Sequence, residues 1–88
     1  MTEPAPIKPT KTTYDVAFFR GESDAEPFTI IPVLAKMPLG ALALTLPLVE
    51  GKKAGRVEVS GNGKIARTFY HVEIQGSQLK YDNPVIVE

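Results

Sequence analysis

The fold of this chain is decided by residues 56–75, which read RVEVSGNGKIARTFYHVEIQ. Charged residues and valines alternate over 56–60, and residues 61–63 then supply two glycines and an asparagine, which tolerate positive φ. A long run with the two-residue period of a strand follows over 64–75. One face of this expected strand consists of Thr68, Tyr70, Val72 and Ile74. The stretch therefore predicts a β-hairpin.

Shorter strand patterns lie on both sides of this hairpin. We expect strands over residues 12–20, 28–35, 78–81 and 85–87, separated by turns rich in glycine, proline and acidic residues. Pro32 falls inside the second of these and cannot donate a ladder hydrogen bond, so it indicates an edge strand or a bulge. Short strands at this spacing predict an all-β fold, a small antiparallel β-sandwich or barrel.

The length of 88 residues indicates one domain with a thin core. Residues 1–11 contain Pro4, Pro6 and Pro9, favour an extended conformation and add little to a core. We therefore expect an extended proline-rich N-terminal arm over 1–11 and a single β domain over 12–88. Hydrophobic residues make up 43% of the chain and charged residues 23%, which is typical of a globular protein and not of a disordered one.

Residues 39–49 carry no charge and permit two interpretations. Leucine stands at positions 42, 44, 46 and 48, which is the period of a strand, and this repeat favours a strand. Alanine and leucine are also strong helix formers, so a short buried helix remains the alternative. If the segment is a strand, Pro47 indicates either an edge strand or a bulge in a central strand that the monomer itself covers, and natural edge strands are usually guarded by charge. An uncharged strand at an edge predicts a surface that another chain covers.

Two pairs of adjacent aromatic residues support the same interpretation. Phe18-Phe19 and Phe69-Tyr70 each lie in an expected strand, where successive side chains point to opposite faces. One member of each pair must then face away from a single core. Either the sheet is covered on both faces, or an aromatic side chain is exposed and favours contact with a partner.

The residues that commonly perform catalysis are sparse. The chain has no cysteine, which excludes disulfides, thiolate nucleophiles and cysteine zinc sites. His71 is the single histidine, and Ser23, Ser60 and Ser77 all lie in expected turns or loops, outside the setting of a nucleophilic serine. The strand pattern predicts a surface His71 near Glu73. We expect no catalytic residue, and we expect that the protein is not an enzyme.

Two loops with some likeness to ligand-binding motifs fail on specific positions. The acidic loop with Glu22, Asp24 and Glu26 lacks the central glycine and the glutamate at its twelfth position that a calcium loop requires. Residues 61–64 end like a phosphate-binding loop but lack its first glycine and its serine or threonine after the lysine. We therefore expect no metal-binding residue, no cofactor-binding residue and no cofactor.

A basic segment carries the alternative function. Between residues 50 and 67, five basic side chains stand against the two acids Glu50 and Glu58. The basic residues are Lys52, Lys53, Arg56, Lys64 and Arg67. A basic hairpin next to aromatic residues is typical of small barrels that bind nucleic acids. The formal net charge of zero does not favour this function, and the hairpin could instead meet the acidic loop, within one chain or between subunits.

These observations favour a non-enzymatic structural or interaction protein, a small β subunit of a larger or symmetric assembly. A viral capsid decoration or accessory protein is one example, by analogy of architecture alone. Its contacts would be the arm and the uncharged strand, with a protein partner or a second copy. We expect no membrane partner, because Lys36 and three prolines interrupt the apolar residues 28–49. No signal peptide is apparent, which fits a cytoplasmic or virion-associated protein but leaves the localisation unknown.

Overall fold

The computed structural model describes residues 11–82 and shows one antiparallel sheet of five strands in the order β2-β1-β3-β4-β5. The strands are β1 (Thr12–Phe19), β2 (Thr29–Ala35), β3 (Lys53–Gly61), β4 (Lys64–Gln75) and β5 (Gln78–Lys80). The prediction of a mostly β, antiparallel fold is confirmed. The strand expected over 85–87 and the arm, apart from Lys11, lie outside the described residues.

The hairpin of β3 and β4 forms as the sequence indicates. Its turn places Asn62 at φ 56° and Gly63 at φ 80°. Two successive positive φ angles belong to the tight turn whose twist matches that of paired strands, and asparagine followed by glycine is the preferred pair for it. The register shifts by one residue near Val59 and Ser60, which marks a bulge.

The segment over 39–49 is helical, so the strand favoured by the leucine repeat is wrong. Helix α1 (Pro38–Thr45) is followed by the 3₁₀ turns η1 (Leu46–Leu48) and η2 (Glu50–Lys52). Pro38 stands in the first turn, where a missing N–H costs nothing, and the following alanines and leucines have high helix propensity. Pro47 lies in η1 and therefore marks no sheet edge. Residues 51–55 are divided between η2 and the start of β3.

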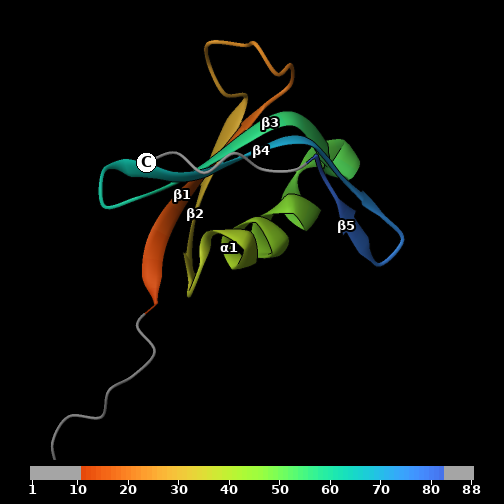
Figure 1. The fold of residues 1–88 in the computed structure, drawn as a ribbon. Coiled ribbons are helices and arrows are strands. Elements are labelled where there is room, and N and C mark those ends of the chain that lie inside the picture. The colour runs from red at the N-terminus through yellow and green to blue at the C-terminus, as the bar shows by residue number, and fades with distance from the viewer. Residues whose placement is uncertain (1–10, 83–88) are drawn as a thin grey trace, which may run out of the picture.

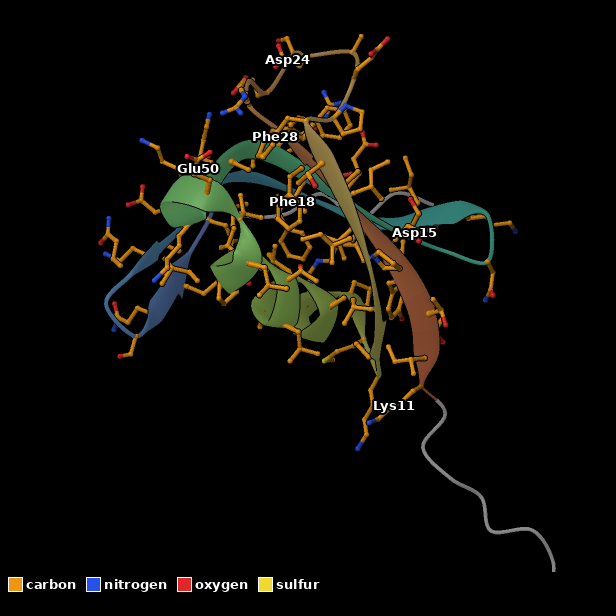
Figure 2. The ribbon with its side chains drawn as sticks, turned by 180° about the vertical axis from the view of Figure 1, so that it is seen from behind. Lys11, Asp15, Phe18, Asp24, Phe28 and Glu50 are labelled. Atoms are coloured by element: carbon orange, nitrogen blue, oxygen red, sulfur yellow. The ribbon has the colours of Figure 1, made fainter. Side chains whose placement is uncertain are left out.

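Helix α1 takes the place of a second sheet. It packs against β1, β2 and β3 on one face of the sheet (Figure 1), and Phe18 points into the space between the sheet and the helix (Figure 2). Over residues 11–82 there is no second sheet, and the strands do not close into a barrel. The largest fully buried side chains are Val16, Phe18, Leu42, Leu46, Val57, Val59, Phe69 and Val72. The finer prediction of a sandwich or barrel thus fails because residues 38–48 cover the core as a helix.

Strand β2 is an edge strand, as Pro32 predicts. It pairs with β1 alone, and Pro32 stands opposite Asp15. Proline is tolerated at an edge because its missing N–H can face solvent, and it removes a donor that another strand could use.

The sheet bends sharply where Gly55 and His71 face each other. The pairs Ala54–Val72 and Arg56–Tyr70 flank this point in register, and His71 has φ 52°, a left-handed conformation. Both Phe69 and Val72 belong to the core, so the alternation of β4 is interrupted between them. The prediction that Thr68, Tyr70, Val72 and Ile74 share one face is therefore wrong, and Figure 1 shows β4 changing direction before it pairs with β5.

Among residues 11–82, no helix has the length and apolar character to cross a membrane.

Candidate functional site: an uncharged face of α1 and η1

One side of α1 and η1 is apolar and exposed. Leu44 and Leu48 retain 56% and 69% of their accessible surface, and Ala43 and Pro47 are exposed between them. Residues three and four apart lie next to each other on a helix, so these four side chains form one continuous surface. We call it the α1–η1 face. No charged residue occurs from Met37 to Val49.

The opposite side of the same segment is part of the core. Ala41, Leu42 and Leu46 are fully buried, and Thr45 is 1% exposed with its hydroxyl donating to the carbonyl of Ala41 over 2.8 Å. A helix that is apolar on all sides is typical of one that is buried on all sides. Within the described chain, the sheet covers half of this helix and leaves the other half open.

A shallow hollow adjoins the α1–η1 face. It has a volume of about 360 Å³ and lies between Ala43 and Pro47 on one side and the hairpin of β4 and β5 on the other. Its further lining residues are Lys52, Ile74, Gly76, Ser77, Gln78 and Leu79. Lys52 is the one charged residue in this lining, so the hollow continues the apolar surface.

A second row of apolar side chains differs from this face. Ile30 and Leu34 on β2 are 55% and 57% exposed, and Pro32 stands between them. Asp15 pairs with Pro32 and is exposed, and Lys36 follows the strand. Charges next to an edge strand discourage contact with other chains, so β2 is the guarded surface of the two.

The pair Phe18-Phe19 does not expose a ring. Phe18 and Phe19 are 0% and 3% exposed, although they point to opposite faces. The guanidinium of Arg56 lies 3.8 Å from the ring centre of Phe19 and covers it. The same group donates to the carbonyl oxygens of Glu22 and Asp24 over 2.7 and 3.0 Å. The chain therefore covers Phe19 by itself, and this aromatic pair gives no support for a partner.

The basic residues do not form one patch. Arg56 is occupied with Phe19 and the β1–β2 loop, and Arg67 lies 5.1 Å from the ring centre of Phe69. Lys53 begins β3, whereas Lys64 pairs with Gly61 at its other end. Eight residues of strand separate these ends by up to about 26 Å. The basic segment does meet the acidic loop within the chain, since Arg56 binds the carbonyl groups of Glu22 and Asp24.

The acidic loop is held as a turn. Asp24 accepts the N–H of Gly21 on its carboxylate over 3.0 Å, and its own N–H donates to the carbonyl of Gly21 over 3.1 Å. The carboxylate of Glu22, in the same loop, lies beside His71. Across residues 11–82, no group of histidine and acidic side chains has an arrangement that could hold a metal ion.

His71 lies between two carboxylates that the sequence pattern does not indicate. Its Nε2 is 2.7 Å from Oε1 of Glu22, and its Nδ1 is 2.6 Å from Oδ2 of Asp82. The expected neighbour Glu73 lies instead with Gln75, whose amide donates to its carboxylate over 2.7 Å. None of the three serines is hydrogen bonded to His71 within the described chain, so the cluster lacks the nucleophile of a serine–histidine site. The bend at His71 explains the difference, since it turns the ring out of the alternation of β4.

Comparisons of this chain with protein-family models, curated proteins and solved structures found no match.

Proposed function

We propose that this domain is a non-enzymatic interaction protein, a subunit that assembles with a second copy of itself through the α1–η1 face. The observation that carries the proposal is the exposure of Leu44 and Leu48 on a helix whose other side is fully buried. Contiguous apolar surface on a small domain is typical of a protein contact.

A second copy suits this face better than a charged partner does. In a symmetric dimer the same surface of each copy meets, so a charged residue on it would often face the same charge on the other copy. The α1–η1 face carries no charge, and Lys52 stands at the rim of the hollow. A nucleic acid would need several basic groups here, and the chain places them elsewhere.

The leucines alone are too few to hold two copies together. Full burial of a leucine contributes about 1.5–3 kcal/mol. A contact between two copies buries the exposed halves of four leucines, two from each copy, and so contributes about 4 kcal/mol. Association costs at least about 4 kcal/mol in lost translational and rotational freedom. The contact must therefore also cover Ala43 and Pro47 and fill the hollow beside β5. We expect association that depends on protein concentration.

Charge placed on the face should separate the copies. We expect the double variant Leu44→Lys with Leu48→Lys to remain monomeric at concentrations where the unchanged chain associates, as measured by light scattering. Both positions are exposed, so the free energy of unfolding of the monomer should change by less than about 0.5 kcal/mol per site.

The matched control is Ile30→Lys with Leu34→Lys on β2, where two leucine-sized side chains are equally exposed. This variant should associate like the unchanged chain. Equal loss of association in both variants, or an unchanged chain that stays at 9.6 kDa at every concentration, would overturn the proposal.

A further inference from the structure

His71 joins two segments that are distant in the sequence. Glu22 belongs to the loop between β1 and β2, and Asp82 follows β5. The imidazole contacts both carboxylates, and the N–H of Asp82 donates to the carbonyl of Tyr70 over 3.0 Å. The ring thus connects the loop and the segment after β5 to the bend of β4.

The geometry favours one protonation state of the ring. A neutral imidazole has one N–H, so its second nitrogen would turn a lone pair toward a carboxylate. The imidazolium donates from both nitrogens, and charge-assisted hydrogen bonds are short; the separations here, 2.6 and 2.7 Å, lie at or just below the short end of their usual range. Both contacts are therefore satisfied together when His71 is doubly protonated.

The two connected segments differ in their other anchors. The loop is also held by two hydrogen bonds from Arg56. The loop is also constrained by Gly55, which lies directly against the backbone of Arg20 and Gly21. Among residues 11–82, Asp82 has one backbone hydrogen bond besides its contact with His71, and the adjacent Tyr81 packs edge-to-face against Phe69 with ring centres 5.2 Å apart. Loss of the ring's charge should consequently loosen Asp82 more than the loop.

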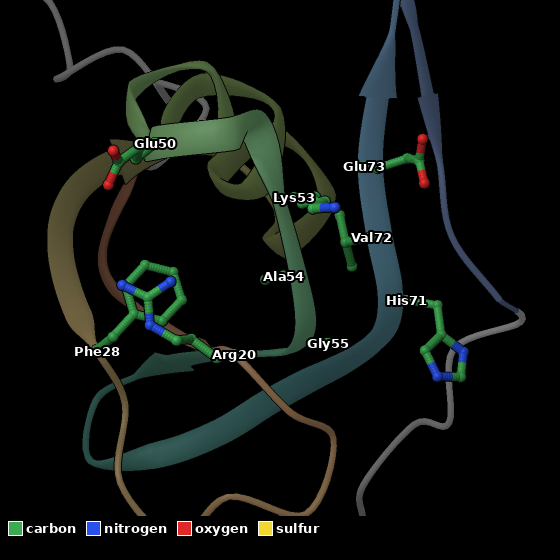
Figure 3. Close-up of a pocket in the computed structure, with 9 residues that line it drawn as sticks. All are labelled: Arg20, Phe28, Glu50, Lys53, Ala54, Gly55, His71, Val72 and Glu73. Carbon is green, nitrogen blue, oxygen red and sulfur yellow. The ribbon is translucent and has the colours of Figure 1, made fainter.

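Other charged groups surround the ring at greater distance. A hollow of about 340 Å³ has His71 and Glu73 on one side and Arg20, stacked on Phe28, on the other (Figure 3), and Glu50 and Lys53 also line it. Tyr70 lies with Glu22 and Asp82 around a second, more open hollow. Among residues 11–82, Glu22 and Asp82 are the two acids within ion-pair distance of the ring.

We propose that Glu22, His71 and Asp82 form a pH-sensitive clasp, which holds Asp82 against β4 while the imidazole is doubly protonated and releases it when one proton is lost. The clasp shares no residue with the α1–η1 face, so it stands or fails independently of the proposed assembly. Release would free the edge of the sheet beside Tyr70.

The direction of the pH dependence follows from the carboxylates. The hydrogen bond with Asp82, and next the negative charge of that residue, raise the pKa of His71 above its usual 6.5; partial desolvation opposes this, and Glu22 adds to it. A raised pKa in the folded state means that the clasp contributes its full stability below pH 6.5. This contribution is lost as the pH rises through the raised pKa.

The single histidine makes the test direct. We expect ¹⁵N chemical shifts of the ring to report an imidazolium at pH 6.5 and a single titration above it. Hydrogen exchange at the amide of Asp82, corrected for the intrinsic rate, should show protection at pH 5.5 that is lost at pH 8.5. The backbone amides directly after Glu22 and Asp24, whose carbonyl groups accept from Arg56, should change their exchange less between these pH values.

Two variants separate the clasp from general effects. Asp82→Asn should lower the pKa of His71 toward its usual value and remove the pH dependence of exchange, whereas Glu73→Gln, which changes an acid outside ion-pair distance, should leave both unchanged. His71→Asn retains a residue that accepts positive φ and removes the charge, so its exchange should be the same at both pH values. A ring that is neutral at pH 6.5, or protection at Asp82 that is equal at both pH values in the unchanged chain, would overturn the proposal.

Discussion

Leu42→Ala should lower the free energy of unfolding by about 2–5 kcal/mol, the usual cost of removing a buried leucine side chain. Leu42 is fully buried between α1 and the sheet. Leu44→Ala should change the free energy by less than about 0.5 kcal/mol, because Leu44 is 56% exposed. Urea unfolding at low protein concentration, where the chain is monomeric, measures both values.

This pair of variants distinguishes a helix from a strand over residues 38–48. In a strand, Leu42 and Leu44 would share one face and would have similar effects. In the helix they lie on opposite sides, and Leu46 and Leu48 repeat the same contrast. Similar losses for Leu42→Ala and Leu44→Ala would contradict the helix.

Gly55→Ala should destabilise the fold by about 3 kcal/mol, at the upper end of the usual cost of overpacking. A Cβ atom at Gly55 would lie 2.5 Å from the carbonyl oxygen of Arg20 and 2.9 Å from the backbone nitrogen of Glu22. These are backbone atoms, so the whole start of the β1–β2 loop would have to move. That movement would also weaken the hydrogen bond from Arg56 to Glu22.

Gly40→Ala is the matched control for this substitution. A Cβ atom there would meet its nearest neighbours, in Met37 and Ala35, at 3.7 and 3.9 Å, which is ordinary contact. Gly40 lies inside α1, where alanine is favoured over glycine by up to about 1 kcal/mol. Thermal unfolding should therefore show a gain for Gly40→Ala and a loss for Gly55→Ala. A Gly55→Ala variant as stable as the unchanged chain would show that the loop does not lie against β3.

The sequence pattern predicts the strands well because their signals are local. Alternation over 56–75 and the Asn62-Gly63 turn specify the hairpin, and Pro32 indicates the edge position of β2. The pattern over 39–49 is ambiguous for a physical reason. Leucines two residues apart have the period of a strand. The same leucines also form two pairs four residues apart, 42 with 46 and 44 with 48, and residues four apart share one side of a helix. Because no charged residue marks a solvent-facing side, the pattern does not distinguish the two. The helix propensity of alanine and leucine, with Pro38 in the first turn, favours the helix.

The surroundings of His71 and Arg56 depend on contacts that no local pattern reveals. His71 meets residues 49 positions before it and 11 positions after it, through a bend that its own positive φ creates. Arg56 covers Phe19 from the neighbouring strand and binds a loop more than 30 residues away. A sequence reading based on alternation assigns both side chains to an open surface. The exposed half of α1 was predicted as an apolar contact surface, although in the form of a strand.

The most direct test of the assembly is a distance between copies. Since the chain has no cysteine, a single Glu50→Cys or Lys64→Cys substitution carries one spin label at a known place. Glu50 is exposed and follows the α1–η1 face, whereas Lys64 lies at the far end of β3 and β4. Pulsed dipolar spectroscopy at high protein concentration should give a shorter distance between copies for the label at position 50 than for the label at position 64. The absence of coupling between copies, or a shorter distance at position 64, would contradict assembly through the α1–η1 face.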